Sequence, residues 1–175
     1  MKRASSPCCD ISLNRLQYQM ENRKLIRSIA MQEIEISKRS VILPTIVALW
    51  EASVTASHDF LSENDIAMLK PSVERAANSV TTLVVGSTDR PVGFMGIEER
   101  KIEMLFLQPE FFRRGIGRAF VRYGFERHGV NSVDCNEQNP GALAFYERMG
   151  FRTIGRTAAD RAGNPFPIWA MRLPD

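Results

Sequence analysis

The sequence has few of the residues that hold metals or cross membranes. Its 175 residues include two histidines and three cysteines, and Cys8, Cys9 and Cys135 lack the paired spacing of a zinc site. The most apolar run, Val41 to Trp50, is far shorter than the roughly 18 residues of a membrane helix. The basic first residues are followed by Cys8 and Cys9 rather than by the apolar core of a signal peptide. We therefore expect a soluble, cytoplasmic protein with no metal site and no membrane partner.

An excess of charge of one sign is also missing from most of the chain. The net charge is +3, from 23 lysines and arginines against 20 aspartates and glutamates. Residues 1–33 hold six basic and three acidic side chains, whereas residues 34–175 hold seventeen of each. Domains dedicated to nucleic acids usually have a basic surface. The balanced charge of residues 34–175 therefore argues against a nucleic-acid partner.

What the sequence does contain is a series of patterns typical of one mixed domain. Residues 1–33 predict an extension, flexible or partly helical, and residues 34–175 predict the domain itself. There we expect strands at 34–36, 81–85, 91–98, 102–107, 131–135, 151–157 and 168–173. We expect helices at 43–53, 62–69, 115–127 and from 139 to 150, with Pro71 interrupting before a helical stretch at 72–78. This order predicts an α/β (α+β) fold, with a mixed sheet and helices on both faces.

The most informative segment runs from residue 105 to residue 118. An apolar strand leads through a proline-broken turn to Gly115 and Gly117 at the start of a helix. Glycines let a ligand approach the unpaired amides of a first helical turn, which carry partial positive charge. Three arginines add phosphate donors, namely Arg113, Arg114 and Arg118. The segment predicts a diphosphate site, with a tight turn and a solvated arginine face as the alternatives. No Lys-Ser or Lys-Thr follows the glycines, so a Walker motif with magnesium is not indicated.

These residues resemble the GNAT superfamily of N-acetyltransferases. Its signature, Gln/Arg-x-x-Gly-x-Gly/Ala, corresponds to residues 112–117, with Phe112 in place of glutamine or arginine. A second signature, Asn-x-x-Ala-x-x-Phe-Tyr followed by Gly-Phe, is met by residues 139–146 and 150–151. The stretches 50–61 and 91–95 resemble the bacterial YjaB subgroup. The resemblance covers residues 34–175 and leaves the extension outside the family pattern.

The resemblance implies a GNAT-like, mostly antiparallel sheet whose central parallel pair of strands splays apart to hold acetyl-CoA. The implied cofactor-binding residues are Leu105, Phe106, Leu107, Arg113, Arg114, Gly115, Ile116, Gly117, Arg118 and Asn139. Because asparagine before a proline is also a common helix cap, Asn139 suits that role equally well.

The resemblance also implies direct acyl transfer from sulfur to nitrogen. Tyr146 matches the family's proton donor to the departing thiolate, and core packing is its alternative role. The general base stays open between Glu103, acting through water, and His58, which titrates near neutrality. Glu103 also suits the outward face of an alternating strand. His58, Asp59 and Phe60 occupy the stretch that lines the family's acceptor site, although a surface turn suits them too.

We therefore expect an acetyl-CoA-dependent N-acetyltransferase whose acceptor is a small-molecule amine or a protein lysine. An enzyme acting on aminoacyl-tRNA would need a strongly basic surface. A non-catalytic acyl-CoA-binding module would not need a proton donor at Tyr146. The sequence leaves open the acceptor, the base, the role of residues 1–33 and whether the protein forms a homodimer.

Overall fold

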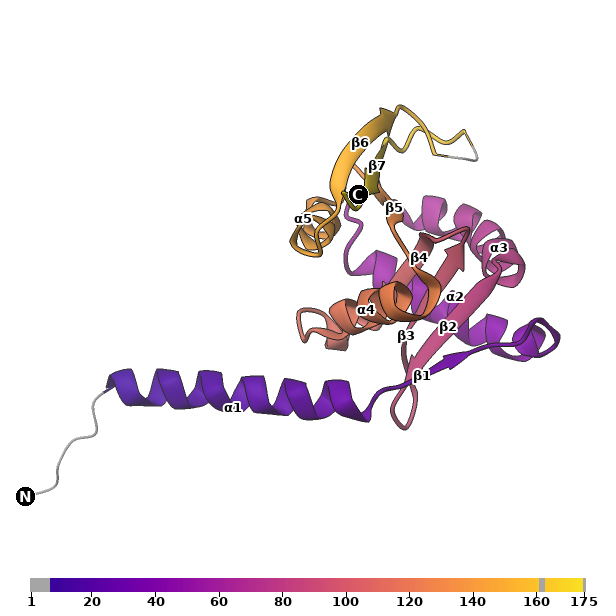
Figure 1. Ribbon diagram of the computed structural model, residues 1–175. Helices are drawn as coiled ribbons and strands as arrows, with labels where there is room; N and C mark the ends of the chain where they lie inside the picture. Colours follow the sequence, from indigo (N-terminus) through magenta and orange to yellow (C-terminus); the bar gives the residue numbers. More distant parts are fainter. Residues whose placement is uncertain (1–6, 161–162, 175) are drawn as a thin grey trace, which may run out of the picture.

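The computed structural model describes residues 7–160 and 163–174, with side chains from Leu16 onward. Helix α1 (Pro7–Ser28) leads into the short strand β1 (Ala30–Glu33). Figure 1 shows α1 as a long helix that projects from the rest of the molecule. Most of the N-terminal extension is therefore helical, and the predictions for residues 1–6 lie outside the described residues.

Within the described residues, seven strands form one sheet in the order β1-β2-β3-β4-β5-β7-β6. The strands after β1 are β2 (Thr82–Ser87), β3 (Pro91–Glu98), β4 (Lys101–Leu107), β5 (Ser132–Asn136), β6 (Arg152–Thr157) and β7 (Ile168–Arg172). All neighbours are antiparallel except β4 and β5, which run parallel. The predicted mixed, mostly antiparallel sheet with a central parallel pair is confirmed.

Helices cover both faces of the sheet, as predicted. They are α2 (Arg39–Thr55), α3 (Glu63–Ser79), α4 (Ile116–His128) and α5 (Pro140–Arg148), with 3-10 turns at Ile36–Lys38 and Pro109–Phe111. On one face, α2 and α3 enclose a core that includes Leu49 and Phe94. On the other face, α4 and α5 enclose a core that includes Phe120 and Phe151. Figure 1 shows α4 in front of the sheet and α2 behind it.

Capping residues lie at several helix ends. Ser62 and Asp65 form a reciprocal capping box at the start of α3. The Asn139 side chain accepts a hydrogen bond from the Ala142 amide at 3.0 Å, so its capping role is confirmed. Gly129 ends α4 with φ +58°, in the left-handed region that glycine adopts without a side-chain clash.

The start of the domain differs from the prediction. The strand predicted over 34–36 is wrong, because β1 ends at Glu33 and the next turn is a 3-10 helix whose Ile36 side chain is exposed. The sheet therefore begins at Ala30, ahead of the expected boundary at residue 34. Helix α2 begins at Arg39, earlier than predicted, which places Pro44 in its second turn.

The predicted interruption at Pro71 is also wrong, because α3 continues through it. A proline removes the hydrogen bond to the carbonyl four residues earlier, here that of Ala67. Both Pro71 and Ala67 are exposed. Water can therefore replace the missing hydrogen bond, and the helix survives.

Arg39 is buried, with 1% of its surface exposed, and nothing in the sequence singled it out. Its guanidinium donates hydrogen bonds to the carbonyls of Asn78 at 2.8 Å, Val80 at 2.6 Å and Thr81 at 3.2 Å. Carbonyls at a helix end lack partners within the helix. Arg39 therefore joins the start of α2 to the end of α3 and the start of β2.

Candidate active site

The sheet opens between the parallel strands β4 and β5. The two strands pair at only two positions, Lys101 with Ser132 and Ile102 with Val133. After Ile102 they diverge, so the remaining backbone of β4 has no strand partner on that side. A ligand with amide groups can bind such an open edge as an added strand does. The predicted contact residues lie on this open stretch and are half-buried, namely Leu105, Phe106 and Leu107.

A loop with unpaired amides follows β4. Arg113 and Gly115 both lie in the left-handed region, with φ +58° and +86°. Ala119 donates to the Gly115 carbonyl at 3.2 Å, in the first hydrogen bond of α4. The amides of residues 116–118 therefore have no partner within the helix, and the helix dipole adds positive charge there. Phosphate groups bind well at such a helix start.

Gly117 lies where three elements of the site meet. A Cβ atom at this position would lie 3.4 Å from the Phe145 ring on α5 and 3.7 Å from Cδ1 of Leu107 on β4. The predicted diphosphate-binding residues Gly115, Ile116 and Gly117 therefore lie beside the open end of β4 and beside α5.

The three arginines of this loop have different surroundings. Within the described part of the chain, the side chains of Arg113 and Arg118 make no ion pair. Arg114 donates from Nε to Oδ1 of Asn22 on α1 at 3.0 Å. Its guanidinium also lies 5.9 Å from the ring centroid of Phe111. Two arginines are therefore available to an anion, and the third is held in place.

Tyr146 is buried in the core at the inner side of α5. Its ring packs edge-on against Phe145 at 5.0 Å and against Phe151 at 5.8 Å between centroids. Burial, together with the nearby Cys135, raises the pKa of the Tyr146 hydroxyl. Burial also raises the pKa of Cys135, on β5, to about 12. Tyr146 therefore keeps its proton at neutral pH, as a proton donor must.

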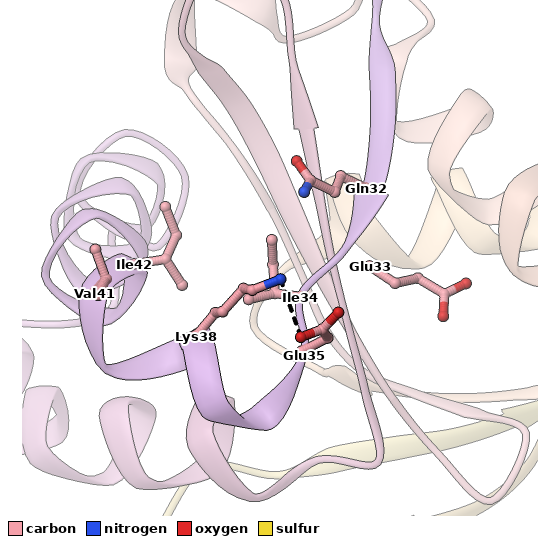
Figure 2. Close-up of a pocket in the computed structure, with 7 residues that line it drawn as sticks. All are labelled: Gln32, Glu33, Ile34, Glu35, Lys38, Val41 and Ile42. Atoms are coloured by element: carbon pink, nitrogen blue, oxygen red, sulfur yellow. Dashed lines mark ion pairs between the residues drawn. The ribbon is translucent and has the colours of Figure 1, made fainter.

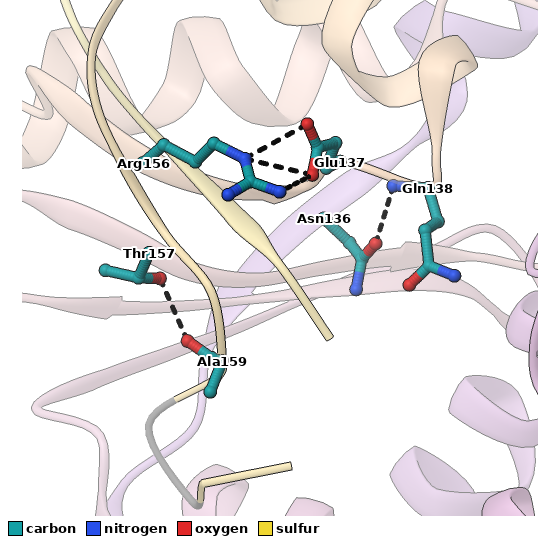
Figure 3. Close-up of polar contacts among 6 residues, drawn as sticks. All are labelled: Asn136, Glu137, Gln138, Arg156, Thr157 and Ala159. Atoms are coloured by element: carbon teal, nitrogen blue, oxygen red, sulfur yellow. Dashed lines mark hydrogen bonds and ion pairs between the residues drawn. The ribbon is translucent and has the colours of Figure 1, made fainter. Parts of the chain in front are cut away.

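Figure 3 shows how the connection between β5 and α5 is braced. Arg156 of β6 donates to both carboxylate oxygens of Glu137, from Nη2 at 2.6 Å and from Nε at 3.1 Å. The Arg156 guanidinium also lies over the Trp169 ring, 5.8 Å from its centroid. A bidentate pair is geometrically more specific than a single hydrogen bond. This contact holds the chain just ahead of Asn139 and so helps to position α5 and Tyr146.

A cavity of about 350 Å³ reaches the open strands from the α2 and α3 side. Its wall is mostly apolar and aromatic, with Trp50 from α2, Phe106 from β4 and Phe166 from the segment before β7. The Phe60 ring lies 5.3 Å from His58 and 6.0 Å from Phe166 between centroids. Aromatic contacts therefore join the α2–α3 connection to the segment before β7 across the cavity.

His58 lines this cavity from the connection between α2 and α3. Burial lowers the pKa of His58, and the nearby Asp59 carboxylate opposes this only in part. The Ser57 hydroxyl donates to the Ser53 carbonyl at 2.7 Å and lies 2.9 Å from His58 Nδ1. A hydroxyl has one proton, so with this proton on the Ser53 carbonyl the matching tautomer has its hydrogen on Nδ1 and donates to Ser57. The lone pair of the imidazole is then on Nε2. Asp59, predicted as a contact residue, is exposed and does not line the cavity.

Glu103 also lines the cavity, from β4. Its carboxylate lies 3.2 Å from Lys101 Nζ, and Lys101 also pairs with Asp134 of β5. These three side chains are mostly buried, with 17% to 32% of their surfaces exposed. The predicted base Glu103 is therefore in the cavity and already engaged in a charge network.

Several cavity residues come from positions without any motif. Asn136 of β5, Asp160 and Asn164 line the cavity together with Phe166. Asp160 accepts from the Asn164 backbone and side-chain amides, both at 2.8 Å, which shapes this wall. The only signal in the sequence is the run of turn-forming residues at 162–165, which predicts a turn and no cavity wall. Because these residues are far from His58 in the chain, the sequence does not show that they line the same cavity.

A second hollow, of about 280 Å³, lies between β1 and the start of α2. Figure 2 shows Lys38 and Glu35 paired at its edge, while Glu33 points away from them. Glu33 instead accepts from Tyr123 at 2.8 Å and lies 2.9 Å from His128. This hollow holds one exposed ion pair and no histidine, and it does not reach the open strands β4 and β5, so it lacks the candidate base and the position of the first cavity.

No cluster of metal-ligating side chains occurs among residues 7–160 and 163–174. Across the same residues, no helix combines the length and apolar character needed to cross a bilayer.

The open sheet edge, the amide-rich helix start and the cavity on the same strands define an acyltransferase with a mixed sheet. The family model of the acetyltransferase (GNAT) domain matches residues 52–172. The chain belongs to this family, and it is an N-acetyltransferase that transfers an acetyl group to an amine.

Known proteins with similar sequences and structures agree with this membership. The chain is 34% identical over 130 residues to peptidyl-lysine N-acetyltransferase YjaB of Salmonella typhimurium strain LT2, covering 74% of this chain and 90% of that protein. The solution structure of apo-form YjaB from Escherichia coli superposes with a TM-score of 0.72 at 29% identity, covering 82% of this chain and 96% of that one. The PaiA N-acetyltransferase of Thermoplasma acidophilum, solved with coenzyme A, shares the fold with a TM-score of 0.57 at 18% identity, over 82% of this chain and 98% of that one.

Proposed function

We propose that the protein acetylates lysine side chains of proteins or peptides in the cytoplasm, with acetyl-CoA as the donor. The observation that carries this proposal is the position of the cavity. Glu103 and Phe106 of β4 and Asn136 of β5 line it, and these two strands enclose the opening in the sheet. An amine in the cavity and a thioester between the strands would therefore meet at one point.

The residues of the opening and the loop fit a coenzyme A thioester. The open edge of β4 at Leu105–Leu107 suits the amides of the pantetheine arm. The amides of residues 115–118, with Arg113, Arg114 and Arg118, suit the diphosphate. The Asn139 oxygen already caps α5, so we assign this residue the placement of α5 and no direct contact with the donor.

The cavity suits a lysine side chain in shape and polarity. A long aliphatic stem can pack against the aromatic wall formed by Trp50, Phe60 and Phe166. The carboxylates of Glu103 and Asp160 favour the approach of an ammonium group. The name of the related YjaB, a peptidyl-lysine N-acetyltransferase, supports the same acceptor.

The proposed reaction needs a base for the attacking amine and a proton donor for the departing sulfur. Acetyl-CoA, when bound, supplies an activated acetyl group as a thioester. The lysine ammonium first releases one proton to solvent, which leaves the nucleophilic amine. As the C–N bond forms and the C–S bond breaks, Nε2 of His58 accepts a second proton from the attacking nitrogen. The Tyr146 hydroxyl gives its proton to the departing sulfur. We prefer His58 as the base because the Glu103 carboxylate is paired with Lys101, and Glu103 acting through water is the alternative.

The test is release of free CoA thiol from acetyl-CoA in the presence of different amines. We expect a lysine peptide to stimulate release well above a matched peptide with norleucine in place of lysine. Mass spectrometry should place the acetyl group on Nε. Faster release with polyamines or with aminoacyl-tRNA than with any lysine peptide would contradict the acceptor. Tight acetyl-CoA binding without stimulation by any amine would contradict the proposal as a whole.

A further inference from the structure

Helix α1 lies outside the matched family domain and yet contacts the predicted diphosphate loop. The family model begins at residue 52, whereas α1 ends at Ser28. Asn22 of α1 accepts a hydrogen bond from Arg114 Nε at 3.0 Å. One helical turn later, Cδ1 of Ile26 reaches Gly115, where a Cβ atom would lie 3.0 Å away. The extension therefore touches two successive residues of the loop.

This end of α1 is anchored to the domain by apolar contacts. Leu25, Ile26 and Ile29 pack against the core on the α4 side of the sheet. With Asn22 they fall at spacings of three, one and three residues, which places all four on one face of the helix. The Asn22–Arg114 contact is thus made by the docked end of α1, although the rest of the helix projects outward (Figure 1).

The hydrogen bond from Arg114 to Asn22 is one of two contacts that fix the position of the Arg114 side chain. Asn22 holds Nε, and the Phe111 ring lies beside the guanidinium plane at 5.9 Å. Guanidinium nitrogens form a rigid planar fork, so fixing Nε also sets the direction of both Nη groups. A fork that is ordered in advance loses less conformational entropy when it binds an anion.

We infer that Asn22 is a positioning residue for the acetyl-CoA diphosphate, and that α1 is a working part of the donor site. The inference rests on the proposed assignment of the diphosphate to the loop at 113–118. Asn22 does not touch the diphosphate in this scheme. It acts through Arg114, so replacing Asn22 should weaken the binding only of an acetyl donor that contains a diphosphate.

The experiment compares two acetyl donors in the full-length protein. Acetyl-CoA contains the diphosphate, and acetyl-pantetheine lacks it. For Asn22→Ala we expect the Kd for acetyl-CoA by calorimetry to weaken several-fold and at most about tenfold, which corresponds to the cost of ordering one free side chain on binding. The kcat at saturating acetyl-CoA and the kcat/KM with acetyl-pantetheine should both stay unchanged. Gln19→Ala, an exposed position on the same helix, is the matched control and should alter neither donor.

A second variant, Asn22→Asp, distinguishes a positioning role of Asn22 from a purely structural role of α1. Asn22→Asp should pair with Arg114 and place a negative charge beside the loop, so it should weaken acetyl-CoA binding more than Asn22→Ala does. Equal losses with both donors, or a Kd for acetyl-CoA within twofold of the parent in Asn22→Ala, would overturn the inference. An unchanged Kd in Arg114→Ala as well would also overturn the diphosphate assignment, and calorimetry reports this even if no amine is acetylated.

Discussion

Replacing Tyr146 with phenylalanine tests the assigned proton donor while leaving the core almost intact. The Tyr146 ring is held edge-on by Phe145 and Phe151 at 5.0 Å and 5.8 Å, and a phenylalanine ring can make both contacts. We therefore expect the free energy of unfolding to change by about 1 kcal/mol or less, the usual net value of one hydrogen-bonding group. The Kd for acetyl-CoA should stay within about twofold, because none of the predicted diphosphate contacts is altered.

The turnover of Tyr146→Phe should fall sharply. General acid catalysis typically contributes about 10²–10⁴ in rate, which is roughly 2.7–5.4 kcal/mol at the transition state. The assay is CoA thiol release at saturating acetyl-CoA and lysine peptide, with calorimetry for the Kd. Tyr123→Phe is the matched control, since it removes a hydroxyl on α4 that donates to Glu33 of β1. A kcat in Tyr146→Phe within about threefold of the parent would refute the assignment.

Three further predictions concern the loop, the buried arginine and the base. Gly115→Ala should cost about 1–2 kcal/mol, because alanine is strained at φ +86°, and should weaken acetyl-CoA binding by calorimetry; full stability would contradict the left-handed conformation. Arg39→Met should lower the free energy of unfolding by about 3 kcal/mol in urea, because it leaves carbonyls at the end of α3 unpaired, whereas exposed Arg75→Met should change it little. Because the pKa of His58 lies below its ordinary 6.5, its titration should add an acidic limb to the kcat/KM profile below pH 6.5, separate from the limb at about 10.4 set by the acceptor lysine. His58→Gln should lose both activity and this acidic limb, and a limb that persisted there but vanished in Glu103→Gln would assign the base to Glu103.

Local sequence determined the elements whose ends depend on the residues nearby. The capping box at Ser62, the cap at Asn139 and the left-handed glycines at 115 and 129 mark their helix boundaries in the structure as they do in the sequence. The three middle strands also follow from their apolar patterns and the short polar links between them. In each case the hydrogen bonds or the side-chain pattern that define the element come from residues close to one another in the chain.

Elements that depend on distant partners were misread. Arg39 at the start of α2 donates to carbonyls about forty residues later, and the position of β1 depends on its pairing with β2. The continuation of α3 through Pro71 depends on which side of the helix faces water. Hydrophobic periodicity contains none of this information, because it reports which face is apolar and not what that face meets.

The sequence by itself determined that this protein has the loop of a GNAT acetyltransferase, because that loop is a contiguous run of glycines and arginines at one helix start. Only the tertiary structure shows the cavity that we propose for the acceptor, which joins His58, Glu103 and Phe166 from three separate segments. It also placed Asn22 of the extension against Arg114. Contacts between segments far apart in the chain arise from packing the sheet and helices together, and no local pattern encodes them.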